Sequence, residues 1–566
     1  MQVVSDWATR LVGPRQTANG RTGALGILLG KPAAALIAGV VLLAPSVVWI
    51  FRDVRVWPWD HAYYASLALQ IRDALHDGAP AWFSAFLTVP ESRAPLLPWL
   101  AQVTLPLTRV LDSPERALLL SNVAVGGITL GLLYSATRRL GGTRAVALTA
   151  MLACAGTSDF IAFNHQFLVE AGQAMAVTGL AWISLRADDV SWPRLAAGTL
   201  FWVTVAMLAK TTSLGYVLPF LLYIAIVCVG ANRRRRSAAT IDFYLLCVTV
   251  PLAAIAVAWY AINWSGVVAH VKEATASDTV IIYGSDRPLL PKLQFWSTAL
   301  LQALSPFPWL AGLLAIVAAC GLVTAAARIE RSRVANLLRK AIASRLLFAL
   351  CLAGTIVVGL LAYARMIAED VRYLAPMVPL AVLLFAWSLV TLRRWWLTAG
   401  AAVLLACNWI ATHAMAQGLI ALPGTALWYL QAPRSDFAAV TRMTRAVRET
   451  CDRNRAGRLN VIGADLADFS APSAWFYAEK MRRTAGYRCN YTSLGYLESD
   501  PQRAIGRLYG LDAEYFVTLP LGNLPASGTD PFDRVSRAVA EWIATSPDFE
   551  RMTPDDDVLA IYRRRR

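Results

Sequence analysis

The segment 33–51 reads AAALIAGVVLLAPSVVWIF, a run of 19 residues without a charged side chain. A helix needs about 20 apolar residues to cross a bilayer, so this run predicts a membrane-spanning helix. Ten further apolar runs follow, near 117–136, 145–162, 167–185, 195–209, 213–230, 241–262, 307–327, 345–364, 373–391 and 395–413. The sequence therefore predicts an α-helical integral membrane protein with about eleven transmembrane helices.

The composition agrees with a membrane-embedded chain. Of 566 residues, 57% are hydrophobic and 16% are charged, whereas a soluble chain carries about 25% charged residues. The 53 Lys and Arg residues exceed the 37 Asp and Glu residues, which gives a net charge of +16. Basic loops on the cytoplasmic side explain this excess without a nucleic-acid partner, so none is expected.

The basic residues also predict the orientation. If the tail 1–32 is cytoplasmic, every strong basic cluster between spans lies on the cytoplasmic side, as the positive-inside rule requires. The clusters are Arg138/Arg139/Arg144, Arg186/Arg194, Arg233 to Arg236, Arg328/Arg331/Arg333/Arg339/Lys340 and Arg393/Arg394. The outer face then carries two long loops, 52–116 and 263–306, a short one at 365–372, and the C-terminal region.

Residues 431–566 form a separate, soluble domain by composition. They contain 38 charged residues, about 28%, against 52, about 12%, in the first 430. Strand-like stretches alternate with helix-like ones, which predicts a small extracytoplasmic α/β domain. The expected strands are residues 459–462, 515–519 and 558–562, and the expected helices are residues 437–450 and 535–545. Cys451 and Cys489 are the two cysteines in polar sequence, and an oxidising compartment would favour a disulfide between them.

Five charged residues are expected at the outer membrane face, where charges are costly and often functional. Asp60 belongs to Trp57-Pro-Trp-Asp60-His-Ala-Tyr63-Tyr64, and Glu170 lies one turn into an apolar helix. The cations are Arg93, Lys210 and Arg372. Each has an ordinary alternative: Asp60 as a helix cap, Glu170 as a satisfied structural carboxylate, and each cation as a snorkelling side chain.

Together, these two acids and three cations suit transfer from a phosphate-activated lipid donor. The cations can hold the departing phosphate, and a carboxylate can take the proton of an acceptor hydroxyl. Because charges in a region of low dielectric favour mutual compensation, we expect the five to converge on one cavity, with a surplus of positive charge for the phosphate. The loop 263–306 is expected to be a partly mobile cover, with Trp296 at the lipid interface.

At these positions the chain resembles the GT-C-fold glycosyltransferases. It is similar to the bacterial family that includes the aminoarabinose lipid A transferase, and more distantly to protein O-mannosyltransferases, over residues 33–415. The motifs are Asp60 to Tyr64, with His61 in place of a second acid; Arg93-Ala-Pro-Leu-Leu-Pro-Trp99, with Arg for Lys; Glu170 where Asp is common; Lys210; and Arg372-Tyr-Leu-x-Pro-x-x-Pro379. Residues 431–566 carry no such motif.

The resemblance implies an inverting transferase that uses a polyprenyl-phosphate sugar in the bacterial inner membrane. Asp60 would be the catalytic base, and Glu170 would orient the acceptor or contribute to a metal site. Donor-phosphate binding would fall to Arg93, Lys210, Arg372, Tyr63, Tyr64 and Tyr373. No cofactor is required; if a divalent metal binds, Glu170 with His165 or His270 would be its ligands.

Two other function classes remain open at this stage. A polytopic lipid or sugar transporter or flippase would place polar residues at the midplane and often shows internal repeats, whereas this chain shows no repeat and its polar residues lie at one face. A membrane-anchored binding protein would act through residues 431–566 alone. The sequence leaves the sugar and the acceptor undefined: lipid A, another glycolipid, a polysaccharide or a protein.

Overall fold

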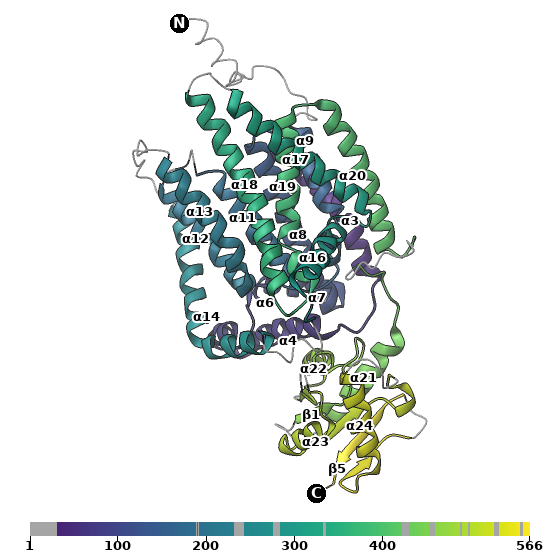
Figure 1. The fold of residues 1–566 in the computed structure, drawn as a ribbon. Helices are drawn as coiled ribbons and strands as arrows, with labels where there is room; N and C mark the ends of the chain where they lie inside the picture. Colours follow the sequence, from purple (N-terminus) through teal and green to yellow (C-terminus); the bar gives the residue numbers. More distant parts are fainter. Residues whose placement is uncertain are drawn as a thin grey trace, which may run out of the picture.

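A helical bundle and a small α/β domain make up the fold (Figure 1). The computed structural model describes residues 31–187, 190, 192–230, 243–275, 284–331, 336–421, 430–451, 459–486, 489–495, 498–525, 531–554 and 558–565. Residues 1–30 of the expected tail and the basic cluster 233–236 lie outside these ranges. The C-terminal domain lies at one end of the bundle, beneath the helix α4.

All eleven predicted spans are helical. They are α3 (Lys31–Arg52), α8 (Pro114–Arg139), α9 and α10 (Arg144–Ala155 and Ser158–Asn164), α11 (Glu170–Ser184), α12 (Trp192–Ala209), α13 (Leu214–Gly230), α14 (Phe243–Thr275), α17 (Pro308–Arg331), α18 (Asn336–Arg365), α19 (Met377–Leu392) and α20 (Trp395–Ala416). Among the described residues, nine helices are long and apolar enough to cross a membrane. The pair α9 and α10, bent by 67°, makes ten if it is one span.

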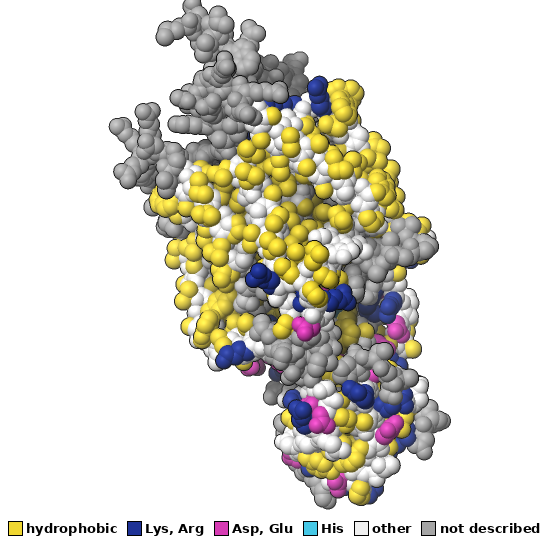
Figure 2. Space-filling model, in the orientation of Figure 1, with side chains coloured by type: hydrophobic (Ala, Val, Ile, Leu, Met, Phe, Trp, Pro, Cys, Tyr) yellow, Lys and Arg dark blue, Asp and Glu magenta, His cyan; other side chains and the backbone are white. Residues whose placement is uncertain are grey.

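Helix α11 has 15 residues, too few to be counted among these membrane-crossing helices, but it is central to the bundle. It packs against α8 and α12, and twelve of its residues are buried. Lipid-facing helices are far less covered: α14 and α20 have 22% and 28% of their apolar windows buried. Figure 2 shows the apolar side chains forming a broad belt over the helices, while charged side chains gather near the C-terminal domain.

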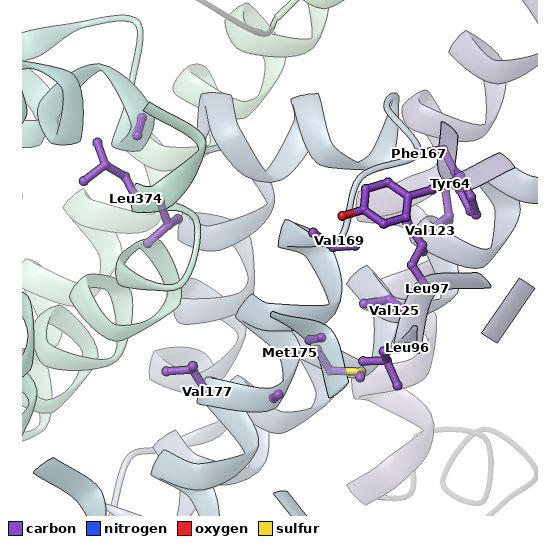
Figure 3. Packing of buried hydrophobic residues seen from close by; sticks show 14 of the residues in the cluster. Tyr64, Leu96, Leu97, Val123, Val125, Phe167, Val169, Met175, Val177 and Leu374 are labelled. Carbon is purple, nitrogen blue, oxygen red and sulfur yellow. The ribbon is translucent and has the colours of Figure 1, made fainter. Parts of the chain in front are cut away.

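The segment 52–116, expected to be the first outer loop, is itself helical. It contains α4 (Trp59–Asp73), α5 (Ala79–Thr88), α6 (Leu96–Thr104) and α7 (Thr108–Leu111), with the 3-10 turns η1 (Ala74–Asp77) and η2 (Leu105–Leu107). Helix α4 is buried from Tyr64 to Leu69 because α6 covers one side and the C-terminal domain another. Figure 3 shows part of this core, from Tyr64 on α4 to Met175 on α11.

The expectations for loop 263–306 are partly wrong. Helix α14 runs on to Thr275, so the loop begins later than expected, and residues 276–283 lie outside the described ranges. A further helix, α16 (Leu289–Leu304), follows. Trp296 is fully buried, 5.3 Å from the ring of Tyr363. It does not lie at the lipid interface, since α16 packs its apolar face against α18 and buries the indole there.

The C-terminal domain has the predicted α/β character. Its sheet has the order β2-β1-β3-β5-β4, with β1 parallel to β2 and β3, and β5 antiparallel to β3 and β4. The strands are β1 (Leu459–Ile462), β2 (Asn490–Ser493), β3 (Tyr515–Thr518), β4 (Phe549–Arg551) and β5 (Ala560–Arg564), and the helices are α21 (Phe437–Cys451), α22 (Ala471–Ala485), α23 (Pro501–Gly510) and α24 (Pro531–Thr545). Helical crossovers through α22 and α23 produce the parallel pairs.

The expected disulfide joins Cys451, the last residue of α21, to Cys489, which precedes β2; their Cα atoms are 5.5 Å apart. We predict that Cys451→Ser lowers the free energy of unfolding of the domain by about 3–4 kcal/mol, because the open chain regains the entropy of a loop of 38 residues. Thermal unfolding followed by fluorescence measures this loss.

Cys407→Ser is the matched control, since Cys407 is a free, exposed cysteine on α20, and its unfolding should match that of the wild type. Alkylation of both Cys451 and Cys489 in unreduced protein would contradict the prediction.

Candidate active site

Asp60 lies between two arginines from distant parts of the chain. It is the second residue of α4, and its carboxylate forms ion pairs with Arg93, from the α5–α6 connection, and with Arg372, from the 3-10 turn η5 (Val371–Leu374). Arg372 Nη1 is 2.8 Å from Asp60 Oδ2, and Arg93 Nη1 donates to Oδ1. The two pairs link residues 33 and 312 positions apart, so they join the first outer loop to the start of α19.

Asp60 is ionised in this arrangement. Burial alone would raise the pKa of its carboxyl group, but the charges and hydrogen bonds of Arg93 and Arg372 outweigh burial and hold the pKa well below its usual value. The neighbouring His61 stays neutral, because burial and the charge of Arg372 lower its pKa to about 3. The negative charge of Asp60 therefore compensates the two arginines, and His61 adds no charge to the site.

Glu170 and Lys210 form a second pair nearby. Glu170, the first residue of α11, is 1% exposed, and its Oε1 is 2.7 Å from Nζ of Lys210. Lys210 follows α12 directly, before the 3-10 turn η3 (Thr211–Ser213). Its ammonium also lies 4.5 Å from the ring centre of Tyr373, the neighbour of Arg372. Tyr373 thus connects the Lys210–Glu170 pair to the Asp60 cluster.

The predicted tyrosines surround these cations. The Arg93 guanidinium lies 4.7 Å from the ring centre of Tyr63 and 5.8 Å from that of Tyr64, within the range of cation–π attraction. The carbonyl of Tyr373 accepts a hydrogen bond of 3.0 Å from the hydroxyl of Tyr216. The structure therefore brings Asp60, Glu170 and the three predicted cations together, with aromatic rings between them.

The described residues do not provide the suggested metal ligands. Within them, no three His, Cys, Asp or Glu side chains lie close enough together to hold a metal ion. His165 stacks flat on Trp49 at 4.2 Å, and Glu170 is paired with Lys210. His270, on α14, interacts electrostatically with Arg93, Asp60 and Lys210, so two cations face it. These residues do not fit a metal site, so we derive no step through one.

Sequence reasoning missed two residues here, and the first of them, Asp370, changes the charge balance of the paired groups. Asp370 caps η5 and accepts a hydrogen bond of 2.7 Å from Nε of Arg372. Three carboxylates therefore meet the three cations, and the expected surplus of positive charge is absent from these pairs. Asp370 stands two residues before Arg372, which is the spacing of a turn cap. The buried Lys292 of α16, a helix that packs on η5, donates to the carbonyl of Met366 at 2.8 Å; nothing in its sequence context marks it.

A third missed residue, Asp159, sits on α10. Its Oδ2 is buried without a hydrogen-bond partner in the described structure, and it interacts electrostatically with Asp370 and Glu170. Its only signal in the sequence was its position as an acidic residue inside the apolar run 145–162.

Known proteins resemble this chain in fold. The structure matches crystal structures of ArnT from Cupriavidus metallidurans, one bound to undecaprenyl phosphate and one in the apo state. Sequence identity is 15% and 12%, the matches cover 95% and 94% of this chain and 98% of each ArnT chain, and the TM-scores are 0.54 and 0.56. The chain has the GT-C fold.

A family model agrees with this result over part of the GT-C fold. Residues 92–260 match the family described as dolichyl-phosphate-mannose-protein mannosyltransferase. No curated protein matches the sequence. The matched family and ArnT are glycosyltransferases of the GT-C type, so the resemblance seen in the sequence is confirmed. The match to ArnT extends over the C-terminal domain, where the sequence shows no family motif.

The Lys210–Glu170 pair yields a stability prediction. We expect Lys210→Met to destabilise the protein by ~3–5 kcal/mol, because it leaves the Glu170 carboxylate buried without its cation. The double variant Lys210→Met/Glu170→Gln should recover most of this loss, since no unpaired charge remains. Thermal unfolding in detergent measures both changes.

Arg503→Gln provides the control. It removes an exposed pair with Asp500, and such pairs contribute about 0–1 kcal/mol. A double variant as unstable as Lys210→Met would show that Lys210 stabilises the fold by packing and not by pairing.

Proposed function

We propose that this protein is an inverting glycosyltransferase of the outer leaflet of a bacterial inner membrane. It moves a sugar from a polyprenyl-phosphate donor to a hydroxyl or phosphate group of a cell-envelope acceptor, such as a glycolipid, a polysaccharide or a protein. The observation that carries the proposal is the Asp60 carboxylate held between Arg93 and Arg372 in a GT-C fold. The N-terminus is cytoplasmic in this proposal, and the C-terminal domain lies outside.

The arginines prepare the site for a phosphate. Guanidinium groups bind phosphate oxygens through paired, charge-assisted hydrogen bonds. Because Asp60 binds both Arg93 and Arg372, an incoming lipid phosphate competes with Asp60 for them. The hydrogen bond from Nε of Arg372 to Asp370 is retained, so the guanidinium stays in place while its Nη1 shifts from Asp60 to the phosphate.

This competition activates the base. As the arginines turn to the phosphate, the pKa of Asp60 rises from its lowered value, and the carboxylate becomes a better proton acceptor. The acceptor hydroxyl attacks the anomeric carbon, the bond from that carbon to the phosphate oxygen breaks, and the proton passes to Asp60. The electron pair leaves with the polyprenyl phosphate, whose charge Arg93, Arg372 and Lys210 stabilise.

The first test is Asp60→Asn. We expect sugar transfer from a polyprenyl-phosphate sugar to envelope acceptors to fall by at least 10²-fold, because the amide keeps the shape but cannot take the proton. Donor binding should be at least as tight as in the wild type, because the neutral amide competes less with the phosphate for Arg93 and Arg372. Radiolabelled transfer and equilibrium binding of the donor measure the two quantities.

Asp500→Asn is the control, since Asp500 caps α23 far from the site and asparagine also caps helices. Full transfer by Asp60→Asn would refute the role of base. Donor movement across vesicles without any transfer by the wild type would favour the transporter alternative.

The second test is Arg372→Ala. We expect weaker donor binding together with slower transfer, because the phosphate is held in both the ground state and the transition state. The sign of the pH effect follows from Asp60. Losing Arg372 raises the pKa of Asp60, so the base becomes protonated at a higher pH. The acid limb of the pH–rate profile should therefore move to higher pH.

An unchanged acid limb in Arg372→Ala would mean that Arg372 does not lower the pKa of the catalytic base, which would contradict this mechanism. Arg442→Ala is the matched control: Arg442 pairs with Asp468 inside the C-terminal domain, and its loss should leave the profile unshifted.

A further inference from the structure

The segment that leads into Asp60 is hydrogen-bonded to the C-terminal domain at two places, Val54 and Trp57. The amide of Val54 donates to the carbonyl of Arg434 at 2.6 Å, and the amide of Asp436 donates to the carbonyl of Val54 at 2.8 Å. Further along, the buried hydroxyl of Ser473 donates to the carbonyl of Trp57 at 2.7 Å. Helix α22, which begins two residues before Ser473, packs against α4, and Figure 1 shows it directly below that helix. The domain is therefore docked on the helix that carries Asp60.

The residue directly before Asp60 has an unfavourable backbone. Trp59 has φ of 29°, in the left-handed region that residues with a Cβ rarely adopt. It is also the first residue of α4, and Pro58 in front of it supplies no side-chain cap. Such conformations persist when surrounding contacts hold them, and they are concentrated at functional sites.

Burial does not hold Trp59, because its side chain is 44% exposed. Its indole nitrogen instead donates a hydrogen bond of 2.8 Å to Oδ1 of Asp465. Asp465 lies in the loop between β1 and α22, where the backbone bridge between Leu466 and Phe469 closes a tight turn. A residue of the C-terminal domain thus fixes the side chain next to the proposed base.

We propose that Asp465 is a positioning residue: through its hydrogen bond to Trp59 it sets the start of α4, and with it the orientation of the Asp60 carboxylate between Arg93 and Arg372. This inference rests on the proposed function for its catalytic consequence. Its structural content, an effect of the C-terminal domain on residues 58–62, stands independently of any transfer assay.

The experiment compares Asp465→Ala with Asp465→Asn in the full-length protein. Alanine removes the acceptor oxygen, whereas asparagine keeps an Oδ1 for the indole. We expect Asp465→Ala to lower kcat by about 10–100-fold, the range that a misplacement of about 1 Å costs, with donor binding within twofold of the wild type. Asp465→Asn should keep kcat within about threefold.

Two further variants make the comparison specific. Trp59→Phe removes the donor of the same hydrogen bond, so the double variant Trp59→Phe/Asp465→Ala should be no slower than either single variant. Asp468→Ala is the matched control, because Asp468 lies in the same turn but pairs with Arg442 within the domain. It should leave kcat unchanged.

Hydrogen–deuterium exchange supplies a readout that does not depend on activity. Faster exchange of the amides of residues 59–62 in Asp465→Ala, with Asp465→Asn and Asp468→Ala like the wild type, is the expected result. Equal behaviour of Asp465→Ala and Asp465→Asn, additive losses in the double variant, or unchanged exchange would overturn the positioning role. If the wild type transfers no sugar while exchange changes as expected, the proposed function fails and the positioning contact stands.

Discussion

The carboxylate of Asp60, shared by Arg93 and Arg372, is the interaction on which the arrangement of this end of the bundle depends. Each charge would be expensive near a membrane if it stood alone, and each is compensated because three separate segments meet there. The start of α4, the connection before α6 and the turn before α19 are fixed relative to one another by these ion pairs. Tyr373 extends the same arrangement to Lys210 and Glu170.

Much of this could be predicted from the sequence, for a physical reason. Charges next to apolar runs are costly, so Asp60, Glu170, Arg93, Lys210 and Arg372 stand out without any structure. The spans follow from the length of apolar runs, and three strands of the C-terminal domain, β1, β3 and β5, follow from their residue types. The Cys451–Cys489 pairing followed from the position of both cysteines in polar sequence.

The remainder depends on tertiary contacts that no local pattern contains. Nothing in the sequence distinguished Asp370 from the other acids of its loop. Its carboxylate binds Arg372, so the three predicted cations meet three carboxylates and not the two that the sequence suggested. Trp296 looked like an interfacial aromatic residue, but α18 covers it. Strands β2 and β4 read Asn-Tyr-Thr-Ser and Phe-Glu-Arg, so they lack the run of apolar residues that marks the predicted strands. The partnership of Trp59 and Asp465 spans 406 positions and leaves no local trace.

That separation has a consequence for how the protein is made. Residues 54–59 leave the ribosome early, but their partners Arg434, Asp465 and Ser473 are translated some 380 to 420 residues later. Chains are synthesised at about 5–20 residues per second, so tens of seconds pass between the synthesis of the start of α4 and that of the residues that contact it. The helices around Asp60 can assemble in the bilayer during that interval, while its approach segment is still unsupported. The contacts of Arg434, Asp465 and Ser473 with residues 54–59 therefore form late in synthesis, after the helices around Asp60 have been made.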